Sequence, residues 1–165
     1  MKRSKLEVRN GYILFFKQWP SNWETAPMII DGTQYNCVEQ FMMAEKARTF
    51  EDTETRNEIL ATLDPKAHRA LGRKVKGYDG SVWDQVRYEI VLRGTKAKYL
   101  QNPDLLALLL DTGEAIFVEC NPFDRIWGIG LSEKSPDAAD PTKWMGQNLL
   151  GRVITQAREE IRKGV

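Results

Sequence analysis

The sequence predicts a single helix-rich α+β domain that contains a small antiparallel sheet. Its strand-like segments are few, and they are not interleaved with helices as βαβ units would be. From Val38 onward, apolar residues recur mostly at helical spacing. The chain has 165 residues, which suffice for one domain with a sizeable core. We therefore expect a basic N-terminal segment over residues 1–11 and one domain over residues 12–165.

The first strand signals lie near the start of the chain. The run "YILFFK" (Tyr12–Lys17) is typical of a buried strand. In "MIIDGTQY", Asp31 and Gly32 stand between two β-prone runs, and both residue types tolerate positive φ. This pattern predicts a hairpin, and with it a small antiparallel sheet that opens the fold.

Helix signals follow, marked by caps, prolines and glycines. Asp64 as N-cap, Pro65 at the first helical position and Gly77 at the end predict a helix in "DPKAHRALGRKVKG". Ser81 is predicted to cap the next helix, and "NPDLLALLLDTG" repeats the order of cap, proline, helix and glycine. The last predicted elements are a short buried strand over Ala115–Cys120 and a helix over roughly Asn148–Lys163.

Composition excludes several classes of protein. The net charge is +1, so bulk charge does not demand a polyanion the size of duplex DNA. The longest strongly apolar run, Leu105–Leu110, is far too short to cross a bilayer, and the apolar segment after the basic start is too short for a signal peptide. We expect a cytoplasmic protein without a membrane segment.

Thiol and metal chemistry have little support in the sequence. Cys37 and Cys120 are the two cysteines and His68 is the single histidine, which supports neither a disulfide framework nor a typical zinc site. No metal or cofactor is predicted. We expect His68 to be a surface side chain, because nothing in its neighbourhood arranges it as part of a catalytic triad.

The segment "NCVEQFMMAEKA" places two charges within an apolar stripe. Glu39 and Lys46 are seven positions apart, so on a helix they lie within about 20° of each other, flanked by Met42 and Met43. One alternative is a solvated helix face bordered by methionines. The other is the wall of a cleft that holds a carboxylate and a lysine with shifted pKa values. Spacing does not choose between them.

Aromatic and turn-rich segments add candidate ligand contacts. Tryptophans in loops suit stacking on a heteroaromatic base, although each could instead fill the core beneath its loop. In "NPFDRIWGIG", Asp124 precedes Trp127 and Gly128, and either contacts a ligand or bonds its own turn. In the basic run that follows Lys66, an arginine such as Arg73 could clamp a phosphate.

Several longer motifs follow one another in a specific order along the chain. They are "SNW" at 21–23, "VEQFMMAEKA" at 38–47, "LGR" at 71–73, "VW" at 82–83, "YLQNPDLLALLLDTG", "VECNPFDRIWGIGL" and "WMGQNLLGRVI". In this order and spacing the sequence resembles the NADAR family, also called the YbiA-like N-glycosidases. The resemblance extends from about Tyr12 to the end of the chain.

The resemblance implies a compact YbiA-like domain that hydrolyses the bond between a ribose C1′ and an amino nitrogen. It implies phosphorylated ribosylamino-pyrimidine intermediates of riboflavin synthesis, or ADP-ribosylated guanine in nucleic acid or nucleotide, as substrates. The family's functional positions fall on Glu39, Trp83 and Asp124, and its helical lysine falls on Lys46. The chain departs from many relatives at Gln40, where they carry a histidine.

Two mechanisms follow as hypotheses from these residues. Lys46 could form a Schiff base at C1′ while Glu39 moves protons, or Glu39 or Asp124 could assist direct attack by water. The expected substrate-binding residues are Asn22, Trp23, Arg73, Trp83, Trp127, Gly128 and Asn148.

Two other functions stay open at this point. One is a non-catalytic module that recognises ADP-ribose or a nucleotide. The other is a structural protein whose aromatic loops form an interface with a partner. The sequence gives no indication of the oligomeric state.

Overall fold

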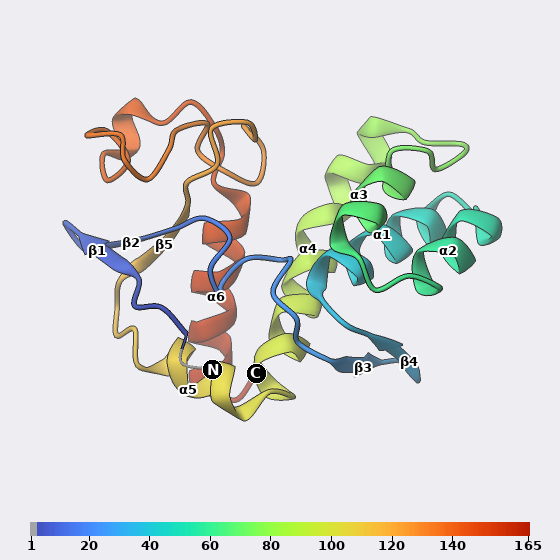
Figure 1. The fold of residues 1–165 in the computed structure, drawn as a ribbon, viewed down its shortest axis with the longest axis horizontal. Helices are drawn as coiled ribbons and strands as arrows, with labels where there is room; N and C mark the ends of the chain where they lie inside the picture. The colour runs from blue at the N-terminus through green and yellow to red at the C-terminus, as the bar shows by residue number, and fades with distance from the viewer. Residues whose placement is uncertain (1–2) are drawn as a thin grey trace. The chain divides into compact units, whose positions relative to one another are not determined.

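A computed structural model describes residues 3–165, and it confirms a helix-rich α+β fold (Figure 1). The described chain forms two compact units, one of residues up to Glu24 with Asp104–Val165, the other Thr25–Pro103. The elements are β1 Glu7–Arg9, β2 Tyr12–Phe15, β3 Met28–Ile30, β4 Thr33–Tyr35, α1 Val38–Thr49, α2 Thr53–Leu60, α3 Pro65–Gly72, α4 Gly80–Leu100, α5 Pro103–Leu110, β5 Ile116–Glu119, the 3-10 helix η1 Pro141–Lys143 and α6 Leu149–Lys163.

The predicted basic segment over residues 1–11 includes strand β1, and its first two residues lie outside the described part of the chain. The division into 1–11 and 12–165 stays a prediction. Within residues 3–165, no helix combines the length and hydrophobicity that a membrane span needs.

The first unit contains a three-stranded sheet in the order β1-β2-β5. β1 pairs antiparallel to β2, with Val8 opposite Ile13, whereas β5 pairs parallel to β2, with Phe117 opposite Ile13. The sequence predicted β5 as a short buried strand without a pairing direction, and the structure shows that it pairs parallel to β2. A parallel partner needs a long crossover connection, and about a hundred residues separate β2 from β5 in the sequence.

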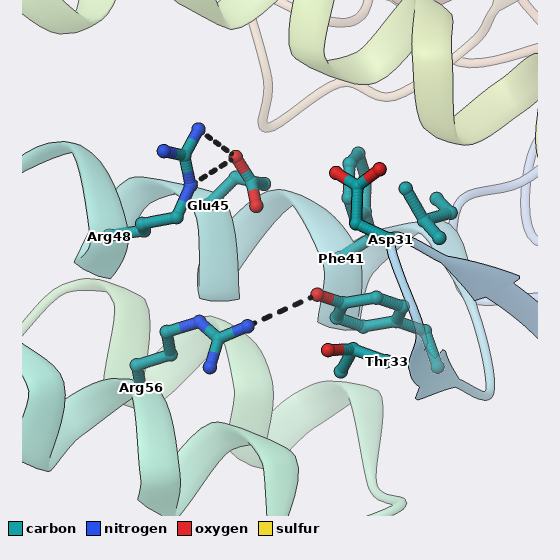
Figure 2. A pocket seen from close by; sticks show the side chains of 8 residues that line it. Asp31, Thr33, Phe41, Glu45, Arg48 and Arg56 are labelled. Atoms are coloured by element: carbon teal, nitrogen blue, oxygen red, sulfur yellow. Dashed lines mark hydrogen bonds and ion pairs between the residues drawn. The ribbon is translucent and has the colours of Figure 1, made fainter.

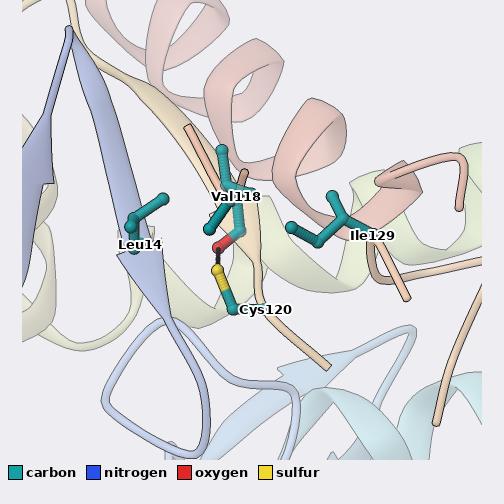
Figure 3. Packing of buried hydrophobic residues seen from close by; sticks show 5 residues of the cluster. Leu14, Val118, Cys120 and Ile129 are labelled. Carbon is teal, nitrogen blue, oxygen red and sulfur yellow. Dashed lines mark hydrogen bonds between the residues drawn. The ribbon is translucent and has the colours of Figure 1, made fainter. Parts of the chain in front are cut away.

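The core of this unit lies where β2 and β5 meet the loop that follows β5. Its buried cluster consists of Leu14, Val118, Cys120, Ile129 and Ala138, of which Figure 3 labels all but the alanine. Helix α6 packs against β5. These contacts fix the chain on both sides of the loop that carries Asp124.

The second unit begins with the predicted hairpin, which the structure confirms. β3 pairs antiparallel to β4, and the turn residues Asp31 and Gly32 have φ values of 50° and 77°, as a type I′ turn requires. Helix α1 then packs against α2, α3 and α4 (Figure 1). A Cβ atom at Gly72 of α3 would lie 2.0 Å from the Met43 sulfur, so a larger residue at this position would require the Met43 side chain to move.

Two predicted helix ends are wrong by a few residues. Helix α3 ends at Gly72 rather than Gly77, and Gly77 instead provides a positive φ of 73° in the following turn. Helix α4 is capped by Asp79 rather than Ser81, because the Asp79 carboxylate accepts the Ser81 backbone N–H at 2.9 Å.

His68 is also not the surface side chain that we expected, because it is fully buried in the second unit. Its Nε2 lies 2.6 Å from the Thr62 carbonyl oxygen, and its Nδ1 lies 3.9 Å from the Cys37 sulfur. With Nε2 donating to the carbonyl, Nδ1 is left to accept the thiol proton, so the ring is neutral in this arrangement. Burial lowers the pKa of His68, and the Thr62 bond offsets this only in part.

This environment predicts a stability that depends on pH. The pKa of His68 is lower in the folded than in the unfolded chain. The contribution of neutral His68 to the free energy of unfolding is therefore complete above the unfolded pKa of about 6.5. It is lost as the pH falls from there through the folded pKa. Urea unfolding at several pH values between 7.5 and 5 should show a wild-type stability that declines more than that of His68→Gln. Parallel curves for the two proteins would contradict the assignment.

Candidate active site

Helix α1 begins at a network centred on Gln40. Its side-chain oxygen accepts the Asn36 backbone N–H at 2.8 Å. Its side-chain nitrogen donates to the Ile59 and Thr62 carbonyl oxygens, both at 3.1 Å. Gln40 is buried, so these bonds satisfy an amide that water does not reach. The residue ties the start of α1 to the end of α2.

Glu39 and Lys46 lie on an apolar face of α1, as their spacing predicts. Glu39 is 6% exposed, and Met42 and Met43 are buried at 5% and 8%. A solvated helix face therefore does not describe Glu39. Lys46 is half-buried.

The environment of Lys46 lowers its pKa below that of a lysine in water. Burial lowers the pKa of Lys46, the Glu39 carboxylate acts in the opposite direction, and the Arg73 guanidinium lowers the pKa further. The three side chains are thus close enough to influence one another. Among the predicted site residues, the structure brings Glu39, Lys46 and Arg73 together in the second unit.

Tyr78 is a neighbour of Lys46 that the sequence did not indicate. The Lys46 nitrogen lies 4.5 Å from the centroid of the Tyr78 ring, and Tyr78 packs edge-on against Phe50 with 5.5 Å between centroids. A cation over an aromatic face is attracted by the ring quadrupole. Tyr78 therefore holds the ammonium in place, and the contact joins residues 32 positions apart, for which no local pattern exists.

Trp83 lies in the first turns of α4 and is 6% exposed. Its ring is packed rather than open, so the alternative in which this tryptophan fills the core describes the structure as it stands. Arg73 follows α3 as its C-cap residue and is exposed, as a side chain that meets a phosphate from solvent would be.

In the first unit, Asp124 bonds its own turn. Its Oδ1 accepts the backbone N–H groups of Ile126 and Trp127, each at 2.9 Å. Its carbonyl oxygen accepts the Gly130 N–H at 3.2 Å. The loop is therefore folded around this aspartate, and its second carboxylate oxygen takes part in neither of these side-chain bonds.

The motif that contains Asp124 and the motif that contains Trp144 form one double loop. The N–H groups of residues 145, 147 and 150 donate to the carbonyl oxygens of residues 129, 125 and 127, at 2.8, 2.9 and 3.1 Å. A Cβ atom at Gly128 would lie 2.8 Å from the Asp124 carbonyl oxygen, and one at Gly146 would lie 2.3 Å from the Gly128 carbonyl oxygen. Both glycines are required by close backbone approach.

Asn148 joins this double loop to the sheet. Its side chain accepts the Glu119 N–H at 2.9 Å and donates to the Phe117 carbonyl oxygen at 3.0 Å, while its own backbone has a φ of 52°. The side chain is 1% exposed. Both ends of the amide are therefore used to hold β5, and a direct substrate contact would require one of these bonds to break.

Asn22 and Trp23 lie in a turn near the end of the first part of this unit. The Ser21 hydroxyl accepts the Trp23 N–H at 3.1 Å. Asn22 is buried, whereas Trp23 is 37% exposed and so presents part of its ring to solvent. Trp127 is intermediate in exposure. These two rings are the more open of the three tryptophans that we expected to bind a base.

Neither thiol is prepared for nucleophilic chemistry. Burial raises the pKa of Cys37 to about 11 and that of Cys120 to about 12. Within residues 3–165, no cluster of three or more histidine, cysteine or acidic side chains is arranged to hold a metal ion.

The sequence-family model of the NADAR domain matches residues 7–162 of the chain. The chain belongs to the NADAR family. An N-glycosidase of Acanthamoeba polyphaga mimivirus is 38% identical over 146 residues, which are 88% of this chain and 86% of that protein. An N-glycosidase of Nostoc punctiforme is 30% identical over 155 residues, with 91% and 92% covered.

A solved structure supports the same assignment at the level of the fold. The NMR structure of the Escherichia coli protein YbiA aligns with a TM-score of 0.77 at 26% identity. The alignment covers 96% of this chain and 89% of that one. The NADAR fold thus accounts for nearly the whole chain.

The charges around Lys46 give opposite predictions for two variants of this NADAR protein. Glu39→Gln should lower the pKa of Lys46 further, because it removes the one charge that raises it, whereas Arg73→Gln should raise it. Reductive ¹³C-methylation followed by NMR titration of the lysine signals measures both shifts. Arg69→Gln, an exposed arginine on α3, is the control. Shifts of the same sign in the two variants would refute this account of the site.

Proposed function

We propose that the protein is an N-glycosidase that releases a base from a phosphorylated ribosyl or ADP-ribosyl substrate. The observation that carries the proposal is the pairing on α1 of a buried carboxylate, Glu39, with a half-buried lysine of lowered pKa, Lys46. Relatives named N-glycosidase in a mimivirus, a cyanobacterium and Escherichia coli support the reaction class. The choice of substrate rests on the chemistry of the family.

The first mechanism uses Lys46 as a nucleophile. The lone pair of the exocyclic nitrogen opens the ribose ring to an imine at C1′, and the ring oxygen takes up a proton. Neutral Lys46 adds to C1′, the base leaves as a free amine with a proton, and water hydrolyses the resulting lysine imine to the sugar aldehyde. Glu39 is the proposed carrier of these protons. A lowered pKa of Lys46 increases the fraction of amine that is ready to add.

The second mechanism omits the covalent intermediate. The C1′–N bond breaks as the base leaves with a proton as a free amine, and Glu39 accepts a proton from the water that attacks the oxocarbenium-like C1′. Here the Lys46 ammonium would stabilise the ionised form of Glu39, and Tyr78 would hold the ammonium in place. Asp124 is the alternative carboxylate for this step.

The expected substrate-binding residues fall into two groups, those with exposed side chains and those with buried ones. Arg73 is proposed to meet a phosphate, and the partly exposed rings of Trp23 and Trp127 are proposed to stack on a base. Residues that are buried or bonded within the fold are proposed to position these contacts and the backbone around them: Asn22, Trp83, Gly128 and Asn148.

A module that only binds ADP-ribose is the competing function. Binding of a phosphorylated ligand is favoured by charged lysine, whereas Lys46 is shifted toward its neutral form. This shift favours catalysis over mere recognition.

Two substrates tested side by side distinguish these functions. The protein is incubated with ADP-ribosylated guanine and with a ribosylamino-pyrimidine phosphate, and free base is measured. Release from one substrate identifies the substrate class, and tight binding without release from either would support the non-catalytic module. Glu39→Gln should slow release by about 10²–10⁴-fold, the usual contribution of acid–base catalysis.

Borohydride added during turnover separates the two mechanisms. A covalent sugar adduct on Lys46 is expected for the imine route, and Lys46→Ala should then lose both the adduct and the activity. Lys74→Ala, an exposed lysine that follows α3, is the matched control. Full activity of Lys46→Ala would exclude the covalent route.

Asp124 can be tested by two substitutions that differ in charge and in hydrogen bonding. Asp124→Asn keeps a side-chain oxygen that can accept the Ile126 and Trp127 N–H groups, whereas Asp124→Ala removes it. If Asp124 only shapes the loop, the asparagine variant should retain activity and melting temperature, and the alanine variant should lose both. A catalytic carboxylate predicts loss of activity in both variants, with the melting temperature preserved in Asp124→Asn.

A further inference from the structure

The second unit contains a cavity that the proposed reaction does not use. It has a volume of about 230 Å³ and lies between the β3-β4 hairpin and helices α1 and α2 (Figure 2). Its walls are formed by Ile30, Asp31, Thr33, Tyr35, Phe41, Glu45, Arg48 and Arg56.

The cavity faces the opposite side of α1 from the candidate catalytic pair. At about 100° per residue, Phe41 lies about 160° from Glu39 around the helix axis, and Arg48 lies about 180° from it. Glu45 lies about 120° from Glu39. One helix therefore presents Glu39 and Lys46 on one side and the wall of this cavity on the other. A ligand in the cavity would be distinct from a substrate at Lys46.

Arg56 is the feature of the cavity that lacks a counterpart. Within the part of the chain that the structure describes, its Nε is buried and has no hydrogen-bond partner. Its guanidinium makes a long contact, 3.5 Å from Nη2 to the Tyr35 hydroxyl, and no carboxylate of residues 3–165 forms an ion pair with it. A buried guanidinium N–H without an acceptor is costly, so an acceptor from outside the chain would be favoured here.

The two carboxylates in the walls are already engaged by other arginines. Glu45 accepts Nε and Nη2 of Arg48 at 2.9 and 2.6 Å, and its side chain is 9% exposed. Asp31 pairs with Arg93 at 2.7 Å. Arg48 and Arg93 thus pair with the two carboxylates of the walls. The positive charge of Arg56 has no carboxylate partner among the wall residues. Figure 2 shows the Glu45–Arg48 pair and Arg56 on facing sides of the cavity.

We propose that this cavity binds an oxyanion of the phosphate class. The guanidinium of Arg56 would supply the principal contact, since its planar fork matches the geometry of a phosphate. The hydroxyl groups of Tyr35 and Thr33 are the neutral donors in the same walls, and the Arg48 Nη1 takes no part in the pair with Glu45. The volume of about 230 Å³ is far above the ~10–15 Å³ that one water needs by the same measure, so the cavity has room for a phosphate group.

The test follows the Arg56 side chain itself in the wild-type protein. ¹⁵N NMR of the arginine Nε–H groups is recorded while inorganic phosphate, or glycerol phosphate as a monoester, is added at constant ionic strength maintained with chloride. The Arg56 signal should shift and saturate with either ligand or both. Tighter binding of the monoester would identify a phosphorylated carrier, and tighter binding of phosphate would identify the free ion. An Arg56 signal that responds no more than it does to chloride would overturn the proposal.

Variants provide a second readout by calorimetry. Arg56→Gln should weaken phosphate binding at this site at least 10-fold, and Arg56→Lys, which keeps the charge but loses the fork, should weaken it less. Arg69→Gln serves as the control and should bind as the wild type does. Unchanged affinity in Arg56→Gln would contradict the proposal. Glu39→Gln should leave the Arg56 signal responsive, so failure of the glycosidase proposal and failure of this one are distinguishable.

Discussion

Burial of helix α1 is the constraint on which the second unit depends. Nine of its residues are buried, and they include Glu39, Gln40 and Glu45 as well as the apolar side chains. Because α2, α3 and α4 pack around this helix, each of its polar groups requires a partner inside the protein. Gln40 meets this requirement with three bonds to neighbouring backbone, and Glu45 meets it with the fork of Arg48. These bonds satisfy the side-chain groups of Gln40 and Glu45 within the protein.

The same constraint creates the chemistry attributed to the helix. A lysine that is partly withdrawn from water loses some of its preference for the charged form, and neighbouring charges then adjust that loss in either direction. Lys46 lies between an acidic and a basic neighbour and over an aromatic ring. On the other side of the helix, Glu45 and Arg48 compensate each other and leave Arg56 without a counterion. One buried helix thus organises two chemically different surroundings.

In the first unit, backbone geometry rather than charge determines the arrangement. Asn148 adopts a left-handed conformation and uses its amide to extend the hydrogen bonding of β5. A Cβ atom at Gly151 would lie 2.1 Å from the Phe117 carbonyl oxygen, so α6 can start beside β5 only with glycine at this position. Asp124 then closes the turn that precedes Trp127. The conspicuous motifs of this unit are therefore explained in large part by close packing of loops.

The sequence by itself determined the helix-rich α+β class, the Asp31-Gly32 hairpin and the Asp64 cap, because these depend on local φ preferences and short-range periodicity. It also placed Glu39 and Lys46 on one face of a helix, since that follows from helical geometry alone. Only the tertiary structure decided that Glu39 is buried, that Tyr78 holds Lys46, that β5 runs parallel and that His68 is internal. These features depend on contacts between residues far apart in the chain, and local patterns do not contain that information.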